Sequence, residues 1–532
     1  MTLSVRDTRG ILDDVVHQFS DPMAFVRELV QNSIDAGSRS IEIDCVHGAQ
    51  DDDNLAVISF RDWGEGMTRQ IIDGELLRLF SSGKDDDFTK IGRFGIGFVS
   101  VFAIEPDAVV VDTGREGEYW RILFAEDRNY ELFSLDGPVE GTWVRIYKSM
   151  DVETFVEMKD DLEGALRKWC KHAGIPILFE GFDIRQEVRV ASQLTTTYQE
   201  EGTEIVMGFS GRDHGLAGYY NRGLTLKESV RSPWPWVCFK IDSRYLEHTL
   251  TRDQVLEDRH FSKAMDLLAE LAEEVLPEKL IDELEELVQN QAPVEELDVY
   301  YGYLAHFLSC DQSFERSWRR RKIFRGAGEE QWTFRQVRRA HRRGRLRVTK
   351  LDGETAALFD EEGVEIVIGD DGLKKLLKQL FGEAPREVES LVLAVVRAQC
   401  DGTYETLRCA VRDLVANTHF EVDEVLIVSG DALPAKMRGV AATIVPTTDG
   451  VISSSTWRRV DCAEIEKCLC PGSTLVVDAD AAQLGPFAAL VEREPEWAAV
   501  ALIESLFAIG DEALWGRAIA ERKRRGNSHV HR

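Results

Sequence analysis

The sequence predicts a chain of several domains in which helices and strands are mixed throughout. Its 532 residues are too many for one hydrophobic core, so three or four domains are expected. Its composition, with 44% hydrophobic and 30% charged residues, is that of a globular protein. Alternating patterns typical of strands and longer periods typical of helices both recur along the chain. The expected fold class is therefore a multidomain α+β and α/β protein.

Bulk features narrow the class of protein further. The sequence contains no run of about eighteen apolar residues, so it predicts no membrane span and no membrane partner. Residues 1–7 lack the apolar core of a signal peptide, which favours the cytosol. The nine cysteines are scattered without a C-x-x-C pair, so reduced thiols are expected. The formal net charge of −30 argues against a general nucleic-acid binder and suits a protein that handles aggregation-prone partners.

The segment Phe25–Gly37 predicts an amphipathic helix with a polar stripe. Glu28, Asn32 and Asp35 fall at i, i+4 and i+7, so they share one face among apolar neighbours. A glutamate in this position can orient and deprotonate a water, and an asparagine offers a carbonyl oxygen to Mg²⁺. The alternative is a solvent-facing polar stripe on a helix that ends at Gly37.

Two predicted strands carry polar residues at their ends. The strand Ile58–Asp62 runs into a turn that contains Gly66. A buried carboxylate at Asp62 can accept a hydrogen bond from an exocyclic amine, and Gly66 allows a flat ring to approach the backbone. The strand 141–147 starts with Thr142, whose hydroxyl is expected beside that carboxylate. The alternative for Asp62 is an ordinary D-x-G turn.

The stretch Ile91–Phe98 contains three glycines at G-x-x-G-x-G spacing. Gly92, Gly95 and Gly97 leave backbone N–H groups free of side-chain bulk. Such a loop can surround a phosphate chain, and the apolar run 99–104 predicts a helix just after it whose dipole favours an anion. For an isolated glycine cluster, the alternative is a flexible turn.

Together, and in this order, the four motifs resemble the nucleotide-binding site of the GHKL ATPase superfamily. This superfamily contains gyrase B, histidine kinases, MutL-type proteins and the ninety-kilodalton heat-shock chaperones. The sequences of residues 91–98 and of the preceding Ser82-Gly83-Lys84 are most similar to those of the heat-shock chaperones. The resemblance covers residues 1–290. It implies a Bergerat-type ATP-binding α/β sandwich over 1–150 and a ribosomal-S5-like α/β middle domain over 151–295.

The resemblance also implies roles for individual residues. Glu28 becomes the general base, Asn32 the Mg²⁺ ligand, and Asp62 the carboxylate that reads adenine. The segment between Met67 and Gly92 becomes a mobile lid over ATP. The nucleotide-binding set that the resemblance implies is Asn32, Asp35, Asp62, Gly66, Met67, Ser82, Gly83, Lys84, Gly92, Arg93, Phe94, Gly95, Ile96, Gly97, Phe98 and Thr142.

A second catalytic residue is expected from the middle domain. The strand 239–246 and the loop after it resemble a chaperone segment in which an arginine reaches into the nucleotide pocket, and Arg252 matches that arginine. Such arginine fingers are worth roughly 10³–10⁵ in rate in well-studied systems. The alternative is a surface salt bridge with Asp253 or Asp258. Leu256 departs from the family pattern, which usually has a polar residue there.

The second half of the chain is less informative. A basic and helical connecting module is expected over 296–384, because between residues 316 and 350 twelve arginines and two lysines stand against two glutamates, with aromatic residues interleaved. This basic stretch fits nucleic acid, an acidic surface of the protein itself or of a client, or simple solvation. A C-terminal α/β domain of unknown role is expected over 385–532, without resemblance to the chaperone dimerisation domain.

The leading functional hypothesis is an ATP-dependent, chaperone-like protein. It would bind ATP and Mg²⁺, hydrolyse ATP slowly as a homodimer, and close its lid and domains on a protein client. The alternative is a nucleotide-gated interaction module of the MORC-like or defence-associated type, which acts through its C-terminal region, with nucleic acid as one candidate partner. A MutL-like repair role is a weaker third option, because the sequences of Gly92–Phe98 and Asp242–Asp253 argue against it.

Overall fold

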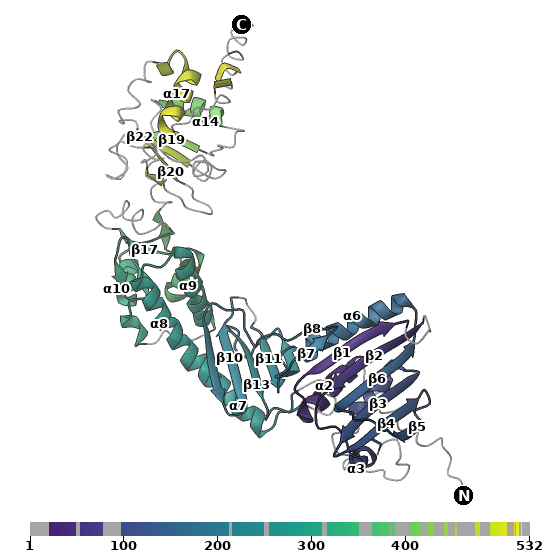
Figure 1. The fold of residues 1–532 in the computed structure, drawn as a ribbon. Coiled ribbons are helices and arrows are strands. Elements are labelled where there is room, and N and C mark those ends of the chain that lie inside the picture. Colours follow the sequence, from purple (N-terminus) through teal and green to yellow (C-terminus); the bar gives the residue numbers. More distant parts are fainter. Residues whose placement is uncertain are drawn as a thin grey trace. The chain divides into compact units, whose positions relative to one another are not determined.

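The computed structural model (Figure 1) shows a multidomain protein of mixed α/β type, which confirms the expected fold class. The chain divides into two compact units, residues 1–273 and 274–532. The finer division at 150, 295 and 384 stays a prediction. The residues that the structure describes are 21–48, 54–77, 97–211, 215–248, 255–310, 316–350, 364–383, 385–388, 404–415, 424–428, 441–444, 453–454, 474–478, 490–507, 515–516, 518–520 and 523.

The first unit is built on an eight-stranded mixed sheet with strand order β5–β4–β3–β6–β2–β1–β7–β8. Strands β1 and β7 pair in parallel, and the other neighbours are antiparallel. The strands are β1 Ile41–His47, β2 Leu55–Asp62, β3 Ala108–Arg115, β4 Glu118–Ala125, β5 Tyr130–Ser134, β6 Gly141–Ser149, β7 Ile177–Phe179 and β8 Phe182–Asp183.

Helices pack on this sheet and close its hydrophobic core. Their bounds are α2 Ala24–Asp35, α3 Arg69–Ile71, the π-helical turn η2 Ile72–Leu76, the 3₁₀ helix η4 Ser100–Ile104 and α6 Val152–Trp169. Helix α2 contacts both α6 and η4. Helix α6 begins where the side chain of Asp151 accepts a hydrogen bond from the Thr154 N–H at 2.8 Å, which satisfies a free donor of its first turn. The core is formed by one face of β1, β2, β3 and β6 together with these helices.

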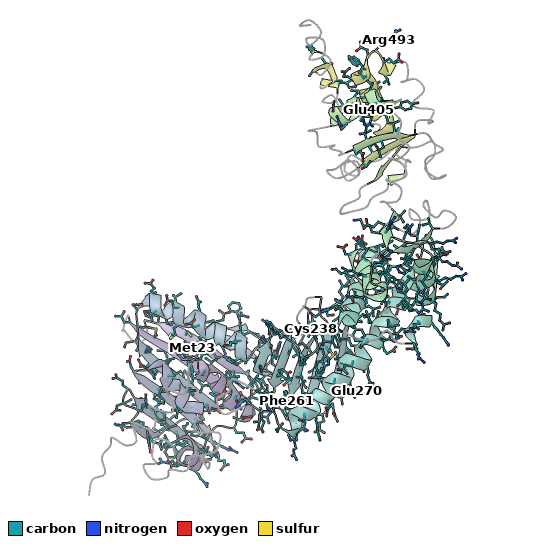
Figure 2. The ribbon with its side chains drawn as sticks, turned by 180° about the vertical axis from the view of Figure 1, so that it is seen from behind. Met23, Cys238, Phe261, Glu270, Glu405 and Arg493 are labelled. Carbon is teal, nitrogen blue, oxygen red and sulfur yellow. The ribbon has the colours of Figure 1, made fainter. Side chains whose placement is uncertain are left out.

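A second sheet of the first unit has five strands in the order β12–β11–β13–β10–β9. The segment 218–226 is a hairpin in this sheet, with its turn at Arg222 and Gly223, both at positive φ. Helix α7 packs on the sheet through Phe261, which Figure 2 labels. The ring of Phe261 lies 6.0 Å from that of Tyr219 on β11. The elements are β9 Thr195–Glu200, β10 Thr203–Phe209, β11 Ala217–Asn221, β12 Leu224–Ser229, β13 Val237–Ser243 and α7 Arg259–Glu270.

The second unit starts with helices that pack around a small parallel sheet. Its three-stranded sheet has the order β17–β16–β18. The carboxylate of Asp298 on α9 accepts from the backbone N–H groups of Asp370, Gly372 and Leu373, at 2.8 to 2.9 Å, and thereby caps α12. The elements are η5 Leu271–Val275, which joins α7 to α8, then α8 Leu276–Gln289, α9 Val294–Ser309, η6 Trp318–Arg320, β14 Phe324–Arg325, β15 Gln331–Trp332, α10 Phe334–Arg342, β16 Leu346–Thr349, β17 Glu365–Ile368, α12 Asp371–Phe381 and β18 Arg386–Glu387.

The C-terminal part of this unit is again α/β. Its four-stranded sheet has the order β19–β22–β20–β21, and α14 and α17 share one hydrophobic core with β19 and β22. The elements are α14 Glu405–Val415, β19 Glu424–Val428, β20 Ala441–Ile444, β21 Ser453–Ser454, β22 Thr474–Asp478 and α17 Pro495–Phe507. Throughout the described part of the chain, every helix is too short or too polar to cross a membrane.

Candidate nucleotide-binding site

Three polar residues lie on the core-facing side of the first sheet, at adjacent strand ends. In β2 the buried residues alternate, and the last of them is Asp62. Side chains alternate in the same way along the other strands, so Thr142 faces the core from β6 and Thr113 faces it from β3. Thr113 pairs directly with Thr142, and β6 is also the neighbour of β2. Strand register therefore brings a carboxylate and two hydroxyls together at one edge of the core.

Asp62 is held by donors from two directions. Its Oδ1 accepts from the backbone N–H of Gly64 at 2.8 Å and of Thr142 at 3.2 Å, and its Oδ2 lies 3.1 Å from the Ser33 hydroxyl on α2. Burial raises the pKa of Asp62, and the three hydrogen bonds oppose that rise. Contrary to expectation, the backbone N–H of Thr142, rather than its hydroxyl, contacts the carboxylate. The hydroxyl lies 3.2 Å from that of Thr113.

An ionised carboxylate has about four lone-pair sites, so Asp62 has room for a further donor beside the three described. The exocyclic amine of adenine is a donor of this type. The backbone of the next turn is packed too closely for any side chain at Gly66. This residue has φ +64°, and a Cβ there would overlap the carbonyl oxygen of Gly114. Met67 follows, and its backbone N–H donates to the Thr113 hydroxyl at 3.0 Å.

Glu28 is buried on α2, with 3% of its surface exposed. This burial excludes the solvent-facing alternative for its part of the polar stripe. Gly97 packs directly against the Glu28 carboxylate, so a Cβ at position 97 would overlap Oε2 of Glu28. The helical segment expected after the glycine loop begins at Gly97 and continues through η4. The last glycine of the loop and the expected general base therefore lie in contact.

The other two residues of the α2 stripe have different surroundings. Asn32 is partly buried one turn after Glu28. Asp35 lies at the end of the helix and forms an ion pair with Arg222, whose guanidinium is 2.5 Å from Asp35 Oδ1. Arg222 belongs to the β11–β12 hairpin of the second sheet. The polar stripe therefore runs from a buried carboxylate to a contact with the second sheet.

Several expected site residues lie outside the described residues. These are Ser82, Gly83, Lys84, Gly92, Arg93, Phe94, Gly95, Ile96 and Arg252. Phe98 is described, and its side chain lies in the core, with its ring 5.5 Å from that of Phe124. Only the backbone of Phe98 can therefore face a ligand. Asp258, an alternative partner for Arg252, caps α7 by accepting from the N–H groups of His260 and Phe261, each at 2.9 Å.

Two residues of the site were missed from the sequence. Ser33 is buried beside Asp62, and Thr113 is fully buried between Met67 and Thr142. A signal was present for both, because each is a small hydroxyl residue at a core-facing position of an otherwise apolar helix or strand. Which carboxylate or amide they meet depends on packing between elements and is not encoded in either segment alone.

If Glu28 is the general base that the resemblance implies, replacing Gly97 with alanine is expected to slow ATP turnover by about 10–100-fold, because the added methyl group displaces the Glu28 carboxylate and small misplacements of catalytic groups have effects of this size. Steady-state kcat and nucleotide affinity measure the effect. The matched control is Gly164→Ala in α6, where a Cβ meets no atom within 4 Å. Unchanged kcat in Gly97→Ala would contradict the assigned contact.

The comparisons with known proteins concern the same part of the chain. Residues 21–128 match the family model described as Histidine kinase-, DNA gyrase B-, and HSP90-like ATPase. Residues 21–128 are thus similar to a GHKL ATPase domain, and this segment is called the GHKL domain below. This confirms the resemblance found in the sequence, and the matched segment contains Glu28, Asn32, Asp62 and Gly97.

Curated relatives of the GHKL domain carry the name Chaperone protein HtpG. The protein from Idiomarina loihiensis is 26% identical over 200 residues, which cover 32% of this chain and 31% of the relative. The one from Porphyromonas gingivalis is 28% identical over 204 residues (33% and 30%). The one from Rhodospirillum rubrum is 25% identical over 283 residues (47% and 42%). The chain thus spans about a third of the length of the first relatives it matches.

A buried histidine between α6 and β7 contacts the second sheet. Nδ1 of His172 lies 2.8 Å from the carbonyl oxygen of Gln186, and Nε2 lies 2.9 Å from Nζ of Lys240 on β13. Because the lysine can only donate, Nε2 accepts and the ring is neutral, with its proton on Nδ1. The ring also packs edge-on against Tyr220, with centroids 4.9 Å apart.

Acidification is expected to destabilise this connection. Burial, reinforced by the charges of Lys240 and Lys171, lowers the pKa of His172 below 6.5. The unfolded chain therefore binds a proton more readily, and the free energy of unfolding falls as the pH drops from 6.5 through the lowered pKa. Urea unfolding between about pH 7.5 and pH 5 measures the slope. His172→Gln should have a shallower slope, and equal slopes in both proteins would contradict the assignment.

Proposed function

We propose that the GHKL domain binds ATP with Mg²⁺ and hydrolyses it slowly. The observation that carries this proposal is the position of α2, which contacts both ends of the expected pocket. Ser33 on this helix touches Asp62, the expected base-reading carboxylate, and Glu28, five residues earlier, touches Gly97 at the end of the phosphate loop. Five residues span about 7.5 Å along a helix axis, so one rigid element holds the two ends at a set distance.

The residues have complementary tasks in this proposal. Asp62 accepts from the exocyclic amine of adenine, and Glu28 holds a water and takes its proton. The amide oxygen of Asn32 fits a Mg²⁺ ion, because it is a neutral oxygen donor, partly buried, one turn from Glu28. When bound, Mg²⁺ neutralises charge on the phosphates. Arg252 supplies a further positive charge from the second sheet's loop, as the family resemblance implies.

We further propose that nucleotide state drives domain closure on a protein client, in a homodimer. Two observations support a chaperone-like role: the relatives are named chaperones, and the formal net charge of −30 favours solubility in the presence of sticky partners. The Asp35–Arg222 ion pair links α2 to the second sheet, and His172 contacts Lys240 of that sheet. A change at α2 on nucleotide binding can therefore act on that sheet.

An aggregation assay tests the client-binding proposal. The full-length protein is mixed with a thermally unfolding model enzyme, and light scattering is followed with ATP, with ADP and without nucleotide. The proposal predicts suppression that depends on ATP and is reduced in Glu28→Ala. Suppression that is equal with and without nucleotide, or absent in every state, would reject the chaperone-like role while leaving ATP hydrolysis untouched.

The second candidate is a nucleotide-gated interaction module that acts through residues 296–532. It is favoured by the arginines of α10, which lack ion pairs within the described residues. In this case bound ATP, rather than turnover, sets the state of the protein. Tight ATP binding with negligible hydrolysis by the wild-type protein would favour this candidate over the first.

A further inference from the structure

A pocket lies within the unit of residues 274–532 and has no part in the nucleotide site. Its volume is about 570 Å³, and its walls come from the ends of α9 and α12, from η6 and from α10. Arg319, Arg338 and Arg342 line it together with His341. None of its described lining residues carries a carboxylate. The pocket is therefore a local concentration of positive charge in a chain with a formal net charge of −30.

The arginines of the basic stretch 316–350 fall into two groups in the structure. Arg321 pairs with two carboxylates of α8, and Arg325 is buried and donates to the carbonyl of Ala292 at 2.7 Å. Between residues 335 and 347, by contrast, no arginine forms an ion pair with any carboxylate that the structure describes. The first group stabilises the fold, and the second group presents charge that the described fold does not neutralise.

Helix stability does not explain this second group. Helix α10 buries Phe334, Val337 and Ala340, and a capping box at Thr333 starts the helix. The helix dipole favours the basic residues of its last turn, but Arg335 lies in the first turn, where the dipole disfavours it. Arginines at i, i+3, i+4 and i+7 also repel one another along the helix. The charge arrangement is costly for the isolated fold, so it points to an external anion.

Aromatic rings lie in the same pocket as the arginines. The rings of His341 and Phe381 are stacked with centroids 4.4 Å apart and planes 10° apart. The ring of Phe334 is also nearly parallel to that of Phe381, at 5.9 Å and 13°. The guanidinium of Arg338 lies over the Phe334 ring at 5.7 Å. Flat aromatic and guanidinium surfaces beside positive charge are what unpaired nucleobases and their phosphates bind.

We propose that this pocket, with the arginine face of α10, binds single-stranded nucleic acid. Phosphates pair with Arg338, Arg342 and the other arginines of α10. A base occupies the pocket against the His341–Phe381 stack. An acidic peptide fits the charges equally well but does not use the ring stack. The overall negative charge does not prevent binding, since charges beyond about 8 Å are largely screened at physiological ionic strength. The site is independent of ATP hydrolysis.

Fluorescence anisotropy of the full-length protein with a labelled oligothymidylate, without nucleotide, tests the proposal. Binding is expected to weaken with salt, with a slope of about −0.7 per phosphate contacted. Arg338→Ala/Arg342→Ala should bind at least about tenfold more weakly. The salt dependence of its binding should correspond to about two fewer phosphate contacts than in the wild type. The matched control, Arg167→Ala/Arg189→Ala, removes the same charge from exposed sites paired with their own glutamates and should change affinity less than about twofold.

Two further measurements separate nucleic acid from other polyanions. Phe381→Leu and His341→Ala should weaken binding of the oligonucleotide several-fold while binding of inorganic polyphosphate stays unchanged, because only the former uses the rings. The proposal is overturned if the wild type fails to bind the oligonucleotide at low salt. It is also overturned if polyglutamate or a duplex of equal length binds as tightly, or if the control pair loses as much affinity as the α10 pair.

Discussion

Glu28→Gln is expected to lower the steady-state rate of ATP hydrolysis by about 10²–10⁴-fold, the range typical of a lost general base. Glutamine keeps the size of the side chain and its packing against Gly97, but it cannot take a proton from water. Because Glu28 is buried, with 3% of its surface exposed, solvent cannot readily replace it as the base. Nucleotide affinity should change little, since the substitution leaves Asp62 and its donors intact.

The experiment compares kcat and ATP affinity in the wild type and in Glu28→Gln. Glu163→Gln is the matched control, because Glu163 is partly exposed on α6, where it pairs with Arg167 at 2.7 Å. The control should retain wild-type turnover. If Glu28→Gln hydrolyses ATP at the wild-type rate, Glu28 is not the general base and the polar stripe of α2 has another purpose.

Asp62→Asn is expected to weaken ATP binding by about 10–100-fold, which corresponds to about 1.5–3 kcal/mol for a hydrogen bond to a charged group. Asparagine has the shape of aspartate, but it lacks the charge that attracts an amine donor. The backbone donors of Gly64 and Thr142 remain, so the fold around the strand end should persist.

A nucleotide analogue separates loss of recognition from loss of structure. Inosine triphosphate has a carbonyl where adenine has its exocyclic amine, so the wild type should bind it more weakly than ATP. In Asp62→Asn this preference should shrink or disappear, because the amide can present a donor to the carbonyl. An undiminished preference for ATP over inosine triphosphate in the variant would exclude Asp62 as the base-reading residue.

The sequence was sufficient for features that depend on a single element. The period of the helix put Glu28 and Asn32 on one face, and the alternation of β2 ended in Asp62 on the buried side. The helical segment after the last glycine of the loop was also predicted correctly. In each case, a local repeat determines which way a side chain faces.

Features that depend on packing between elements could not be predicted in the same way. The meeting of Ser33 with Asp62 requires the position of α2 on the sheet, and that of Thr113 with Thr142 requires the β3–β6 register. The turn at Arg222 divides a segment that has a strand-like pattern on both sides.

The basic stretch shows a further limit of sequence interpretation. Its arginines look alike in sequence, yet Arg321 and Arg325 have partners within the fold and Arg342 is exposed. Which arginines are neutralised depends on where the acidic face of α8 lies, and this is a property of the folded unit. The distinction between structural and available charge therefore appears only in three dimensions.

Equilibrium binding of ATP and Mg²⁺ to the full-length wild-type protein, measured by calorimetry, tests the central claim most directly. We predict saturable binding with one nucleotide per chain, weakened in Asp62→Asn and retained in Glu28→Gln. The absence of saturable binding up to about 1 mM ATP, where an interaction would be worth only about 4 kcal/mol, would contradict a nucleotide site at this pocket.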